Sequence, residues 1–418
     1  MKIRKLFFLA IIAVLLGVVT TCEDTDSPTN RQGDTENKYG PAYTVPGGTL
    51  TAKLQWLESN AVSNTNYIIE VANDEFINPQ SLYFSGRSNI TIQLKGIGGE
   101  KVIQNNATKE SLFTIRNNVT LILKENIVLN GSSYSILVSE GGGTFIMEGG
   151  KIDRVRVDGG TFTMIGGEIS DHVRVYGGTF TMNGGKIDRV SVYGGTSTMN
   201  GGESGGVLVE GTFTMNGGTI SNEYESVRVR GTFTMNGGTI TGITTAFSYG
   251  VVLVEEGGTF TMNGGEISGN TSGIYVGGGG VLVEGGTFNM TGGEISGNTF
   301  YGNGYGGGVC IIAISSSSSN YYNTNYNTNF RKTGGIITGY SSDHINGNVV
   351  KDYDDEIQNG RGHAIYAEVN GGYDEYGNRS SSFIRFKDTT VGEQDNLSYV
   401  SNGQNPPTIS GAWDELDE

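Results

Sequence analysis

The hydrophobic pattern of residues 141–300 alternates with a period of two inside a longer repeat. In the stretch Thr161–Met164, Phe and Met fall on one face of a strand and both Thr on the other. This TFTM phrase or a one-residue variant of it, followed by one residue and Gly-Gly, recurs at intervals of 16 to 28 residues. Its leading residues are Thr144, Thr161, Thr179, Thr196, Thr212, Thr232, Thr259 and Thr287. Short alternating strands and Gly-rich turns at this period predict an all-β solenoid, a single-stranded parallel β-helix.

Each repeat predicts one coil of the solenoid. The pair Gly166-Gly167 turns the chain, Ile169 marks a second short strand, and Val173 and Val175 mark a third. Coils about 4.8 Å apart place equivalent residues above one another. A Phe column, interrupted by Ser197, and a Met column follow. Eight of the nine Met occupy the latter: Met147, Met164, Met182, Met199, Met215, Met235, Met262 and Met290. This regularity favours a packed core over a metal or redox role for Met.

The pattern changes to a helical period over residues 49–61. Leu50, Leu54, Leu57 and Ala61 share one helical face, and Thr49 is placed to cap the helix. We expect this amphipathic helix to cover the open N-terminal end of the solenoid, because terminal coils need capping. Residues 46–140 are therefore predicted to hold a cap and irregular opening coils. Trp56 is expected to pack rather than to bind a ligand.

Residues 301–418 are predicted to form closing coils and a C-terminal cap. They include a low-complexity polar insertion at 315–330 and an acidic tail at 414–418. Cys310 lies in an apolar strand and is expected to be buried. Longer loops are predicted at 242–250, 269–280 and 297–308, where a ligand could bind.

The N-terminus reads as an export signal. Residues 1–21 have a basic start and an apolar run from Leu6 to Val19 that is too short for a comfortable membrane span. The segment at the end of the apolar run, Val19-Thr20-Thr21-Cys22, is similar to a bacterial lipobox, which makes Cys22 the expected site of lipid attachment. A plain signal peptide is the alternative. Residues 22–45 are polar and are predicted to be a disordered tether.

Composition narrows the functional classes. The 418 residues include 69 Gly but 6 Pro, which fits many tight turns, and the formal net charge is −16. An acidic surface repels nucleic acid, so sequence-independent nucleic-acid binding is excluded. Two cysteines cannot build a disulfide framework.

The segments WLESNA, YIIEVANDEF, ITIQLKG, SLFTIRNNVTLIL and NIVLNG, leading into GGTFIMEGGKI, carry a family likeness. With the C-terminal region they resemble the right-handed parallel β-helix repeat surface lipoproteins of the treponemal and spirochaete type, in the pectate-lyase-like β-helix superfamily. The resemblance implies a right-handed coil, export and a membrane-anchored place at the outer membrane or cell surface. It implies no agreed activity and no cofactor. The short coils at 144–212 leave a left-handed coil open, and no catalytic motif of pectin-degrading β-helices is found.

Acidic residues recur after the Gly-Gly turns. Lys151, Glu168, Lys186 and Glu203 would alternate in sign up the stack as an ion ladder, whereas Glu266 would lie above Glu294. Glu255 and Glu284 would stack in the same way. Paired carboxylates about 5 Å apart could serve a retaining glycosidase or hold a cation. The alternative is like-charge repulsion that the nearby loops offset, and no metal site is predicted.

The third strand is predicted to present basic and aromatic residues outward. Arg156, Arg174 and Arg228 form a candidate stripe for an anion or glycan, with Tyr176 and Tyr193 as an aromatic platform. A solvated ion network with nearby aspartates is the alternative. His172 lies beside these charges without a partner motif, so it is not expected to be catalytic.

Three functional classes follow. The sequence favours a non-enzymatic exported surface lipoprotein, a scaffold for adhesion or for contact with envelope, host protein or extracellular glycan. The alternative is a polysaccharide-active or carbohydrate-binding β-helix. A second alternative is ice or flat-surface binding through the T-x-T pairs, although Thr also favours exposed strands in general. These pairs are Thr161/Thr163, Thr179/Thr181, Thr196/Thr198, Thr212/Thr214, Thr232/Thr234 and Thr259/Thr261.

Overall fold

The computed structural model describes residues 39–418, except 132, 223–224, 246–249, 274–276, 303–304, 314–326, 341–346, 360, 370–382, 388, 403–407 and 414–418. The predicted signal peptide, Cys22, most of the tether, most of the 315–330 insertion and the acidic tail lie outside the described residues. Residues Ala42–Glu418 form one compact unit.

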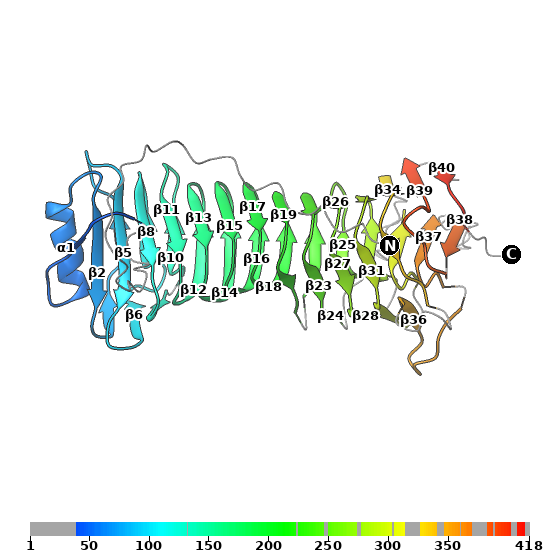
Figure 1. Ribbon diagram of the computed structural model, residues 1–418, viewed down its shortest axis with the longest axis horizontal. Helices are drawn as coiled ribbons and strands as arrows, with labels where there is room; N and C mark the ends of the chain where they lie inside the picture. The colour runs from blue at the N-terminus through cyan, green and yellow to red at the C-terminus, as the bar shows by residue number, and fades with distance from the viewer. Residues whose placement is uncertain are drawn as a thin grey trace, which may run out of the picture. The chain divides into compact units, whose positions relative to one another are not determined.

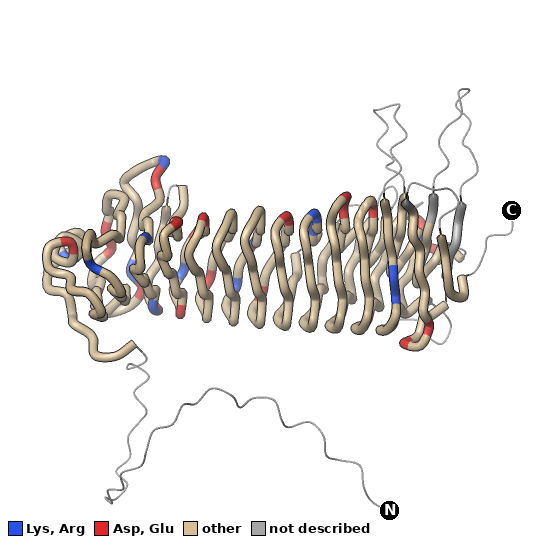
Figure 2. The backbone as a smooth tube through the Cα atoms, turned by 90° about the horizontal axis from the view of Figure 1, so that it is seen from above, with Lys and Arg blue, Asp and Glu red and all other residues tan. Residues whose placement is uncertain are grey.

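That unit is a parallel β-helix whose coils stack along one axis (Figures 1 and 2). Two long sheets and a short third sheet line its faces. Sheet A contains β1 (Ala42–Thr44), β2 (Asn66–Val71), β5 (Ile90–Gly96), β8 (Val119–Leu123), β11 (Thr144–Met147), β13 (Thr161–Met164), β15 (Thr179–Met182), β17 (Thr196–Met199), β19 (Thr212–Met215), β22 (Thr232–Met235), β26 (Thr259–Met262), β30 (Thr287–Met290), β34 (Asn327–Lys332), β39 (Leu397–Asn402) and β40 (Thr408–Ser410).

Sheet B provides the opposing wall of the core. It contains β3 (Glu75–Ile77), β4 (Gln80–Leu82), β6 (Lys101–Asn105), β7 (Phe113–Ile115), β9 (Ile127–Asn130), β10 (Ile136–Val138), β12 (Lys151–Val157), β14 (Glu168–Val175), β16 (Lys186–Val192), β18 (Glu203–Val209), β20 (Thr219–Ile220), β21 (Val227–Val229), β23 (Thr239–Thr241), β25 (Gly250–Val254), β27 (Glu266–Ser268), β29 (Gly278–Glu284), β31 (Glu294–Ser296), β33 (Val309–Ile312), β35 (Ile336–Ile337), β37 (Ile365–Val369) and β38 (Phe383–Lys387).

The register of sheet A confirms the predicted columns. Phe162 pairs with Phe180, and Met164 with Met182, in parallel strands. The rings of Phe162 and Phe180 stack with centroids 4.8 Å apart. Both columns are buried, and the gap in the Phe column falls at Ser197, as expected. The core therefore repeats one packing arrangement from coil to coil.

The second Gly of each Gly-Gly turn is required at the corner after sheet A. Gly202 has φ +86°, and a Cβ there would lie 2.6 Å from Cε of Met182 in the preceding coil. Glycine avoids both the strain and the clash. The corner therefore brings each coil close to the Met side chain beneath it.

The prediction of separate second and third strands is wrong for the shortest coils. The strands β12, β14, β16 and β18 each run through both predicted strands, and irregular register at Ile152/Arg154 and Ile169/His172 marks the bend. These coils have too few residues for a further corner, so a bulge bends the strand instead. From β20 and β21 onward the two strands are separate.

The longer coils add sheet C. The strands β24 (Thr244–Thr245), β28 (Thr271–Gly273), β32 (Thr299–Tyr301) and β36 (Val349–Lys351) pair in parallel. The segments predicted as loops therefore contain short strands, because their extra length lets successive coils pair with one another. At the adjoining corner, the buried amides of Asn270, Asn298 and Asn348 are hydrogen-bonded in series.

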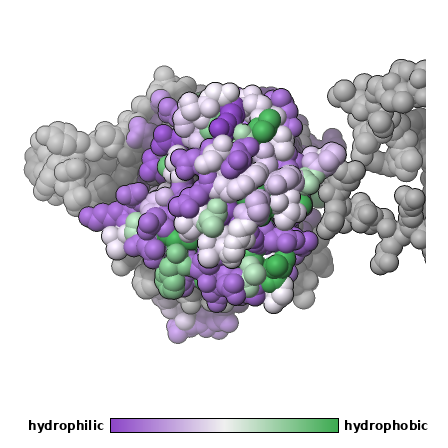
Figure 3. Space-filling model, turned by 90° about the vertical axis from the view of Figure 1, so that its left-hand side faces the viewer, coloured by the Kyte–Doolittle hydropathy of each residue, from purple (hydrophilic) through white to green (hydrophobic). Residues whose placement is uncertain are grey.

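The N-terminal cap is α1 (Leu50–Asn60), as predicted. The Thr49 side chain accepts a hydrogen bond from the Ala52 N–H, and Leu50, Leu54 and Leu57 are buried against the first coils. Trp56 stacks on Tyr43 with centroids 5.3 Å apart, which confirms its packing role. The described surface at this end is mainly hydrophilic with separate apolar patches (Figure 3), as expected of a capping element.

Parallel pairing between successive coils continues in sheet B as far as β37. Beyond it, β38 pairs antiparallel with β37, β39 with β34 and β40 with β39. The chain thus reverses direction at this end of both long sheets. An antiparallel strand covers the free edge of the last coil. It does not present the parallel edge onto which a further coil, or the coil of a second molecule, could stack.

Candidate functional site

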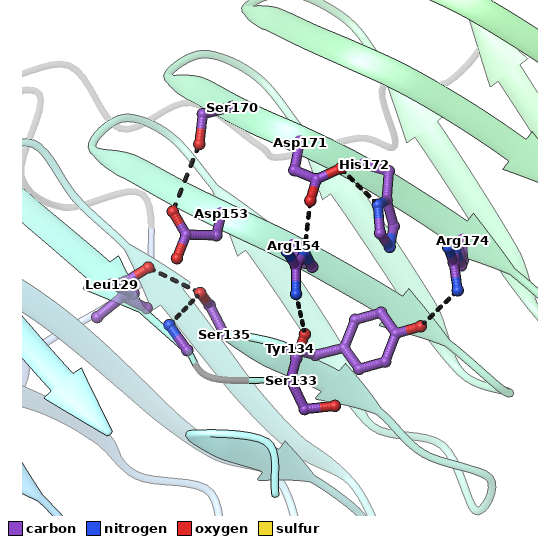
Figure 4. Close-up of polar contacts among 11 residues, drawn as sticks. Leu129, Ser133, Tyr134, Ser135, Asp153, Arg154, Ser170, Asp171, His172 and Arg174 are labelled. Atoms are coloured by element: carbon purple, nitrogen blue, oxygen red, sulfur yellow. Dashed lines mark hydrogen bonds and ion pairs between the residues drawn. The ribbon is translucent and has the colours of Figure 1, made fainter. Parts of the chain in front are cut away.

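The outer face of sheet B carries a polar cluster between residues 133 and 193, which Figure 4 shows in part. In β14, Val173 and Val175 point into the core, so His172 and Arg174 point outward by strand alternation. Tyr176 follows at the next outward position. Tyr134 precedes β10, which lies two coils before β14, and its side chain reaches across this face to Arg174.

Asp171 joins the first two partners of the cluster. Its carboxylate accepts a hydrogen bond from Arg154 Nε at 2.5 Å and lies 2.7 Å from Nδ1 of His172. Burial opposes ionisation, but hydrogen bonds from Arg154 and His172 outweigh it and hold the pKa of Asp171 below its usual value. This carboxylate therefore stays charged in the fold.

His172 is a buried histidine, 8% exposed, whose ring lies nearly perpendicular to the Tyr134 ring with centroids 5.9 Å apart. Burial lowers its pKa, and Arg174 and Arg154 add to this effect, although Asp171 acts in the opposite direction. Its Nε2 has no hydrogen-bond partner within the described residues. The neutral imidazole is therefore the favoured form near neutral pH.

Arg156 is both paired and covered. Its Nε donates to Asp158 at 2.6 Å, and its guanidinium lies 4.6 Å from the centroid of Tyr176 and 5.9 Å from that of Tyr134. Tyr176 in turn stacks on Tyr193 with centroids 4.9 Å apart. The two tyrosines are 42% and 36% exposed. The predicted aromatic platform is therefore present and accessible to solvent.

Arg174 differs from the arginines around it. Its Nη1 donates to the Tyr134 hydroxyl at 3.2 Å, and no carboxylate of the described residues forms an ion pair with it. Arg154, Arg156 and Arg189 pair with Asp171, Asp158 and Glu225. The cluster thus carries one guanidinium whose charge is not neutralised within the described part of the chain.

The predicted stripe is not continuous. Arg156 and Arg174 are neighbours in register, but Ser191 and Leu208 occupy the next two positions. Arg228 follows them and donates to Glu255, after which Leu253 takes its place in the column. Arg228 therefore lies in the same outward column as Arg174, but the coils between them carry uncharged side chains at this position.

The acidic residues form two different arrangements. Glu266 pairs in register with Glu294, and with Glu393 they line an open groove of about 490 Å³. Glu255 and Glu284 follow the paired Val254 and Val283, but Glu255 is neutralised by Arg228 and Arg230. Burial and the neighbouring Glu255 raise the pKa of Glu284. Within the described residues, no group of three His, Cys, Asp or Glu side chains is placed to hold a metal ion.

The ion ladder has the predicted register, with Lys151, Glu168, Lys186 and Glu203 at successive positions. Lys186 Nζ lies 4.0 Å from the Glu203 carboxylate, and Lys151 pairs with Glu100 at 3.5 Å. All four side chains are exposed. Pairs of this kind contribute little to stability.

The Thr rows also have the predicted register. Thr161 pairs with Thr179 and Thr163 with Thr181, and the rows continue through β26. At β30, Asn289 takes the place of the second Thr of the pair. At β34, Asn329 and Arg331 take the places of the first and second Thr. The T-x-T face is therefore a regular outer surface of sheet A.

Sequence reasoning missed a row of amides and the role of Tyr134. Four Asn that follow these strands donate from Nδ2 to the Asn of the preceding coil at 2.9 Å: Asn200 to Asn183, Asn216 to Asn200, Asn236 to Asn216 and Asn263 to Asn236. Reading one position further in the phrase TFTMNGG would have revealed this ladder. Tyr134 lies in a non-repeating segment, so no pattern indicated it.

Over the described residues, no helix combines the length and apolar character needed to cross a membrane. Cys310 is buried beside Leu282 and Tyr366, as its apolar strand predicted. The comparisons with family models, curated proteins and solved structures gave no match to this chain.

Proposed function

We propose that this protein is an exported, lipid-anchored surface protein of the treponemal β-helix type, which acts as a non-enzymatic scaffold for adhesion. The observation that supports this role is the coil-to-coil register of sheet A. From β13 to β26, outward Thr and inward Met repeat in every coil, and inward Phe repeats in every coil except that of Ser197. Stacked strands with a continuous core make a stiff body.

Repetition also suits an adhesive role. A side chain that recurs in each coil presents the same weak contact many times along one face. Several simultaneous weak contacts give much stronger attachment than one contact alone. The outer Thr rows and the exposed Asn ladder both have this form.

The lipid anchor is tested by replacing Cys22→Ser in cells that express the full chain. We expect the natural protein to incorporate an alkyne-labelled fatty acid, to fractionate with membranes and to be cleaved by protease added to intact cells. The C22S variant should lose the label and leave the membrane fraction. Unchanged labelling in C22S would reject the proposed attachment site.

The non-enzymatic role needs a separate test. Purified protein is incubated with acidic and neutral polysaccharides, and the products are separated by size and by reducing-end analysis. We expect no shortening of any polymer. Depolymerisation that is lost in the Glu266→Gln/Glu294→Gln double variant would instead support the polysaccharide-active alternative.

Carbohydrate binding is the second candidate, favoured by the exposed stack of Tyr176 and Tyr193. Aromatic rings at a surface offer apolar area together with a hydroxyl group. A glycan array probed with the natural protein and with Tyr193→Ala tests this function. Binding that disappears in the variant supports it, and a blank array opposes it.

Flat-surface binding through the T-x-T pairs is a further candidate, because both Thr rows lie in register over several coils. An ice-recrystallisation assay at micromolar protein tests it directly. Inhibition that Thr198→Lys and Thr214→Lys abolish would support this function. Ice crystals that grow as in buffer would reject it.

A further inference from the structure

We propose that Arg174, with Tyr134, Tyr176 and Tyr193, forms a binding site for a terminal sugar that carries a carboxylate. The site lies on the outer face of sheet B, in the coils of β14 and β16. This inference gives the proposed adhesive role a ligand and rests on that role for its biological setting. Its binding test is independent of the lipid anchor.

The charge of Arg174 is the first argument. The neighbouring arginines on this face pair with carboxylates: Arg154 with Asp171 at 2.5 Å, Arg156 with Asp158 at 2.6 Å, and Arg189 with Glu225. Arg174 makes its described hydrogen bond to a neutral phenol. An anionic group beside Arg174 would therefore gain an ion pair without displacing an existing carboxylate.

The orientation of the guanidinium is the second argument. Nη1 donates a hydrogen bond to the Tyr134 hydroxyl at 3.2 Å, whereas Nε and Nη2 make no hydrogen bond within the described residues. These two N–H groups lie side by side on one edge of the planar group. That edge matches the two oxygens of a carboxylate, which it can bind in a bidentate manner.

The tyrosines supply the third argument. Tyr134 accepts a hydrogen bond from Arg174, and Tyr176 comes two residues after Arg174 on the same outward side of the chain. Tyr176 and Tyr193 are exposed and stacked, and Arg156 holds Tyr176 from the other side at 4.6 Å. A pyranose has apolar C–H faces and several hydroxyls, so it can pack on such rings and hydrogen-bond to their hydroxyl groups.

The surroundings favour one acidic sugar over a charged polymer. In register with Arg174, the preceding coil offers the paired Arg156, and the following coils offer Ser191 and Leu208. A polymer with a carboxylate on each residue would meet no second unpaired arginine here. The formal net charge of −16 would also repel it. A neutral glycan that ends in one carboxylated sugar avoids this penalty.

The test titrates purified full-length protein with 3′-sialyllactose and with lactose, which lacks only the carboxylated sugar, and follows binding by calorimetry and ligand-observed NMR. We expect 3′-sialyllactose to bind in the millimolar range or tighter, and lactose to bind at least about tenfold more weakly. Arg174→Gln should lose about tenfold in affinity for 3′-sialyllactose. Arg174→Lys should lose part of this, because it keeps the charge but not the bidentate edge.

Arg228→Gln is the matched control, because it removes a guanidinium from the same sheet face that is already paired with Glu255. It should bind as the natural protein does. Tyr193→Ala should weaken the binding of both ligands.

Equal binding of lactose and 3′-sialyllactose would overturn the proposal. Undiminished binding of 3′-sialyllactose by R174Q with an unchanged melting temperature would do the same. The proposal would also be overturned if a poly-glutamate peptide bound in a manner that requires Arg174 while 3′-sialyllactose did not bind. If the sugar-binding site fails in one of these ways but fatty-acid labelling still depends on Cys22, the proposed lipid-anchored scaffold stands.

Discussion

Phe213 meets Phe233 edge-on in the core, with ring centroids 5.4 Å apart and ring planes at 61°. One coil later, Phe233 and Phe260 stack at 4.9 Å and 20°. The difference follows from Ser197, which occupies the Phe position in the coil before Phe213. A small side chain there leaves Phe213 without a ring to stack on, and its ring adopts a different tilt.

Ser197→Ala should stabilise the protein. Ser197 is fully buried, and its hydroxyl has no hydrogen-bond partner within the described residues. Removing a buried hydroxyl that lacks a partner should raise the free energy of unfolding by about 1 kcal/mol, measured by urea denaturation. The exposed Ser170→Ala serves as control, with a change within about 0.5 kcal/mol. A loss of stability in S197A would show that the hydroxyl is satisfied in solution.

Asn298→Ala should be among the most damaging single substitutions. The buried Asn298 amide donates to the Ile267 carbonyl and to Asn348, and accepts from Asn270. Its removal leaves several buried polar groups unpaired, so the free energy of unfolding should fall by about 3 kcal/mol or more. Denaturant titration monitored by circular dichroism measures the change.

Asn216→Ala is the matched control for that substitution. Asn216 also stands in an amide ladder, but its hydrogen bonds to Asn200 and Asn236 are exposed to water. Water can replace them, so the loss should stay below about 1 kcal/mol. Equal losses in the two variants would contradict the assigned difference between buried and exposed ladders.

His172 should make stability fall as the solution is acidified. Its folded pKa lies below the model-peptide value of 6.5, so the unfolded chain binds more protons in the interval between the two values. Stability is therefore lost as pH falls through about 6.5 and levels off below the folded pKa. The charges around His172 are Arg154, Arg174, Arg189 and Asp171.

His172→Gln should flatten this pH dependence. Unfolding free energies of both proteins are measured from about pH 7.5 to about pH 5, and their difference isolates the His172 contribution from that of the acidic residues. Parallel curves would mean that His172 titrates alike in the folded and unfolded chains.

Glu284→Gln should raise stability at neutral pH. Burial and Glu255 raise the pKa of Glu284 above 4.5, so its charged form costs free energy in the fold. The neutral amide removes that cost, with a gain of about 0.5–1 kcal/mol. The gain should shrink as pH falls through the raised pKa, because the natural carboxyl then becomes neutral too. Thermal unfolding at several pH values measures it, with the exposed Glu256→Gln as control.

The repeating core could be predicted from the sequence because its causes are local. Alternation within Thr161–Met164 decides which side chains point inward, and a recurring phrase makes each coil dictate the register of the next. The helix and its Thr49 cap were predictable for the same reason. The exposed stack of Tyr176 and Tyr193 followed directly from that register.

Only the tertiary structure decided which charges are neutralised and where the coil changes form. Arg174 and Arg228 occupy equivalent positions in their strands, yet Arg228 meets Glu255 while Arg174 meets the hydroxyl of Tyr134. Both partners belong to other coils than the arginine that they contact, and Tyr134 also lies in a segment outside the repeat. The bulges in β12 and β14, sheet C and the antiparallel end likewise depend on how coils of unequal length fit together. Alternation along one strand carries no information about such contacts, because they form between side chains distant in the chain.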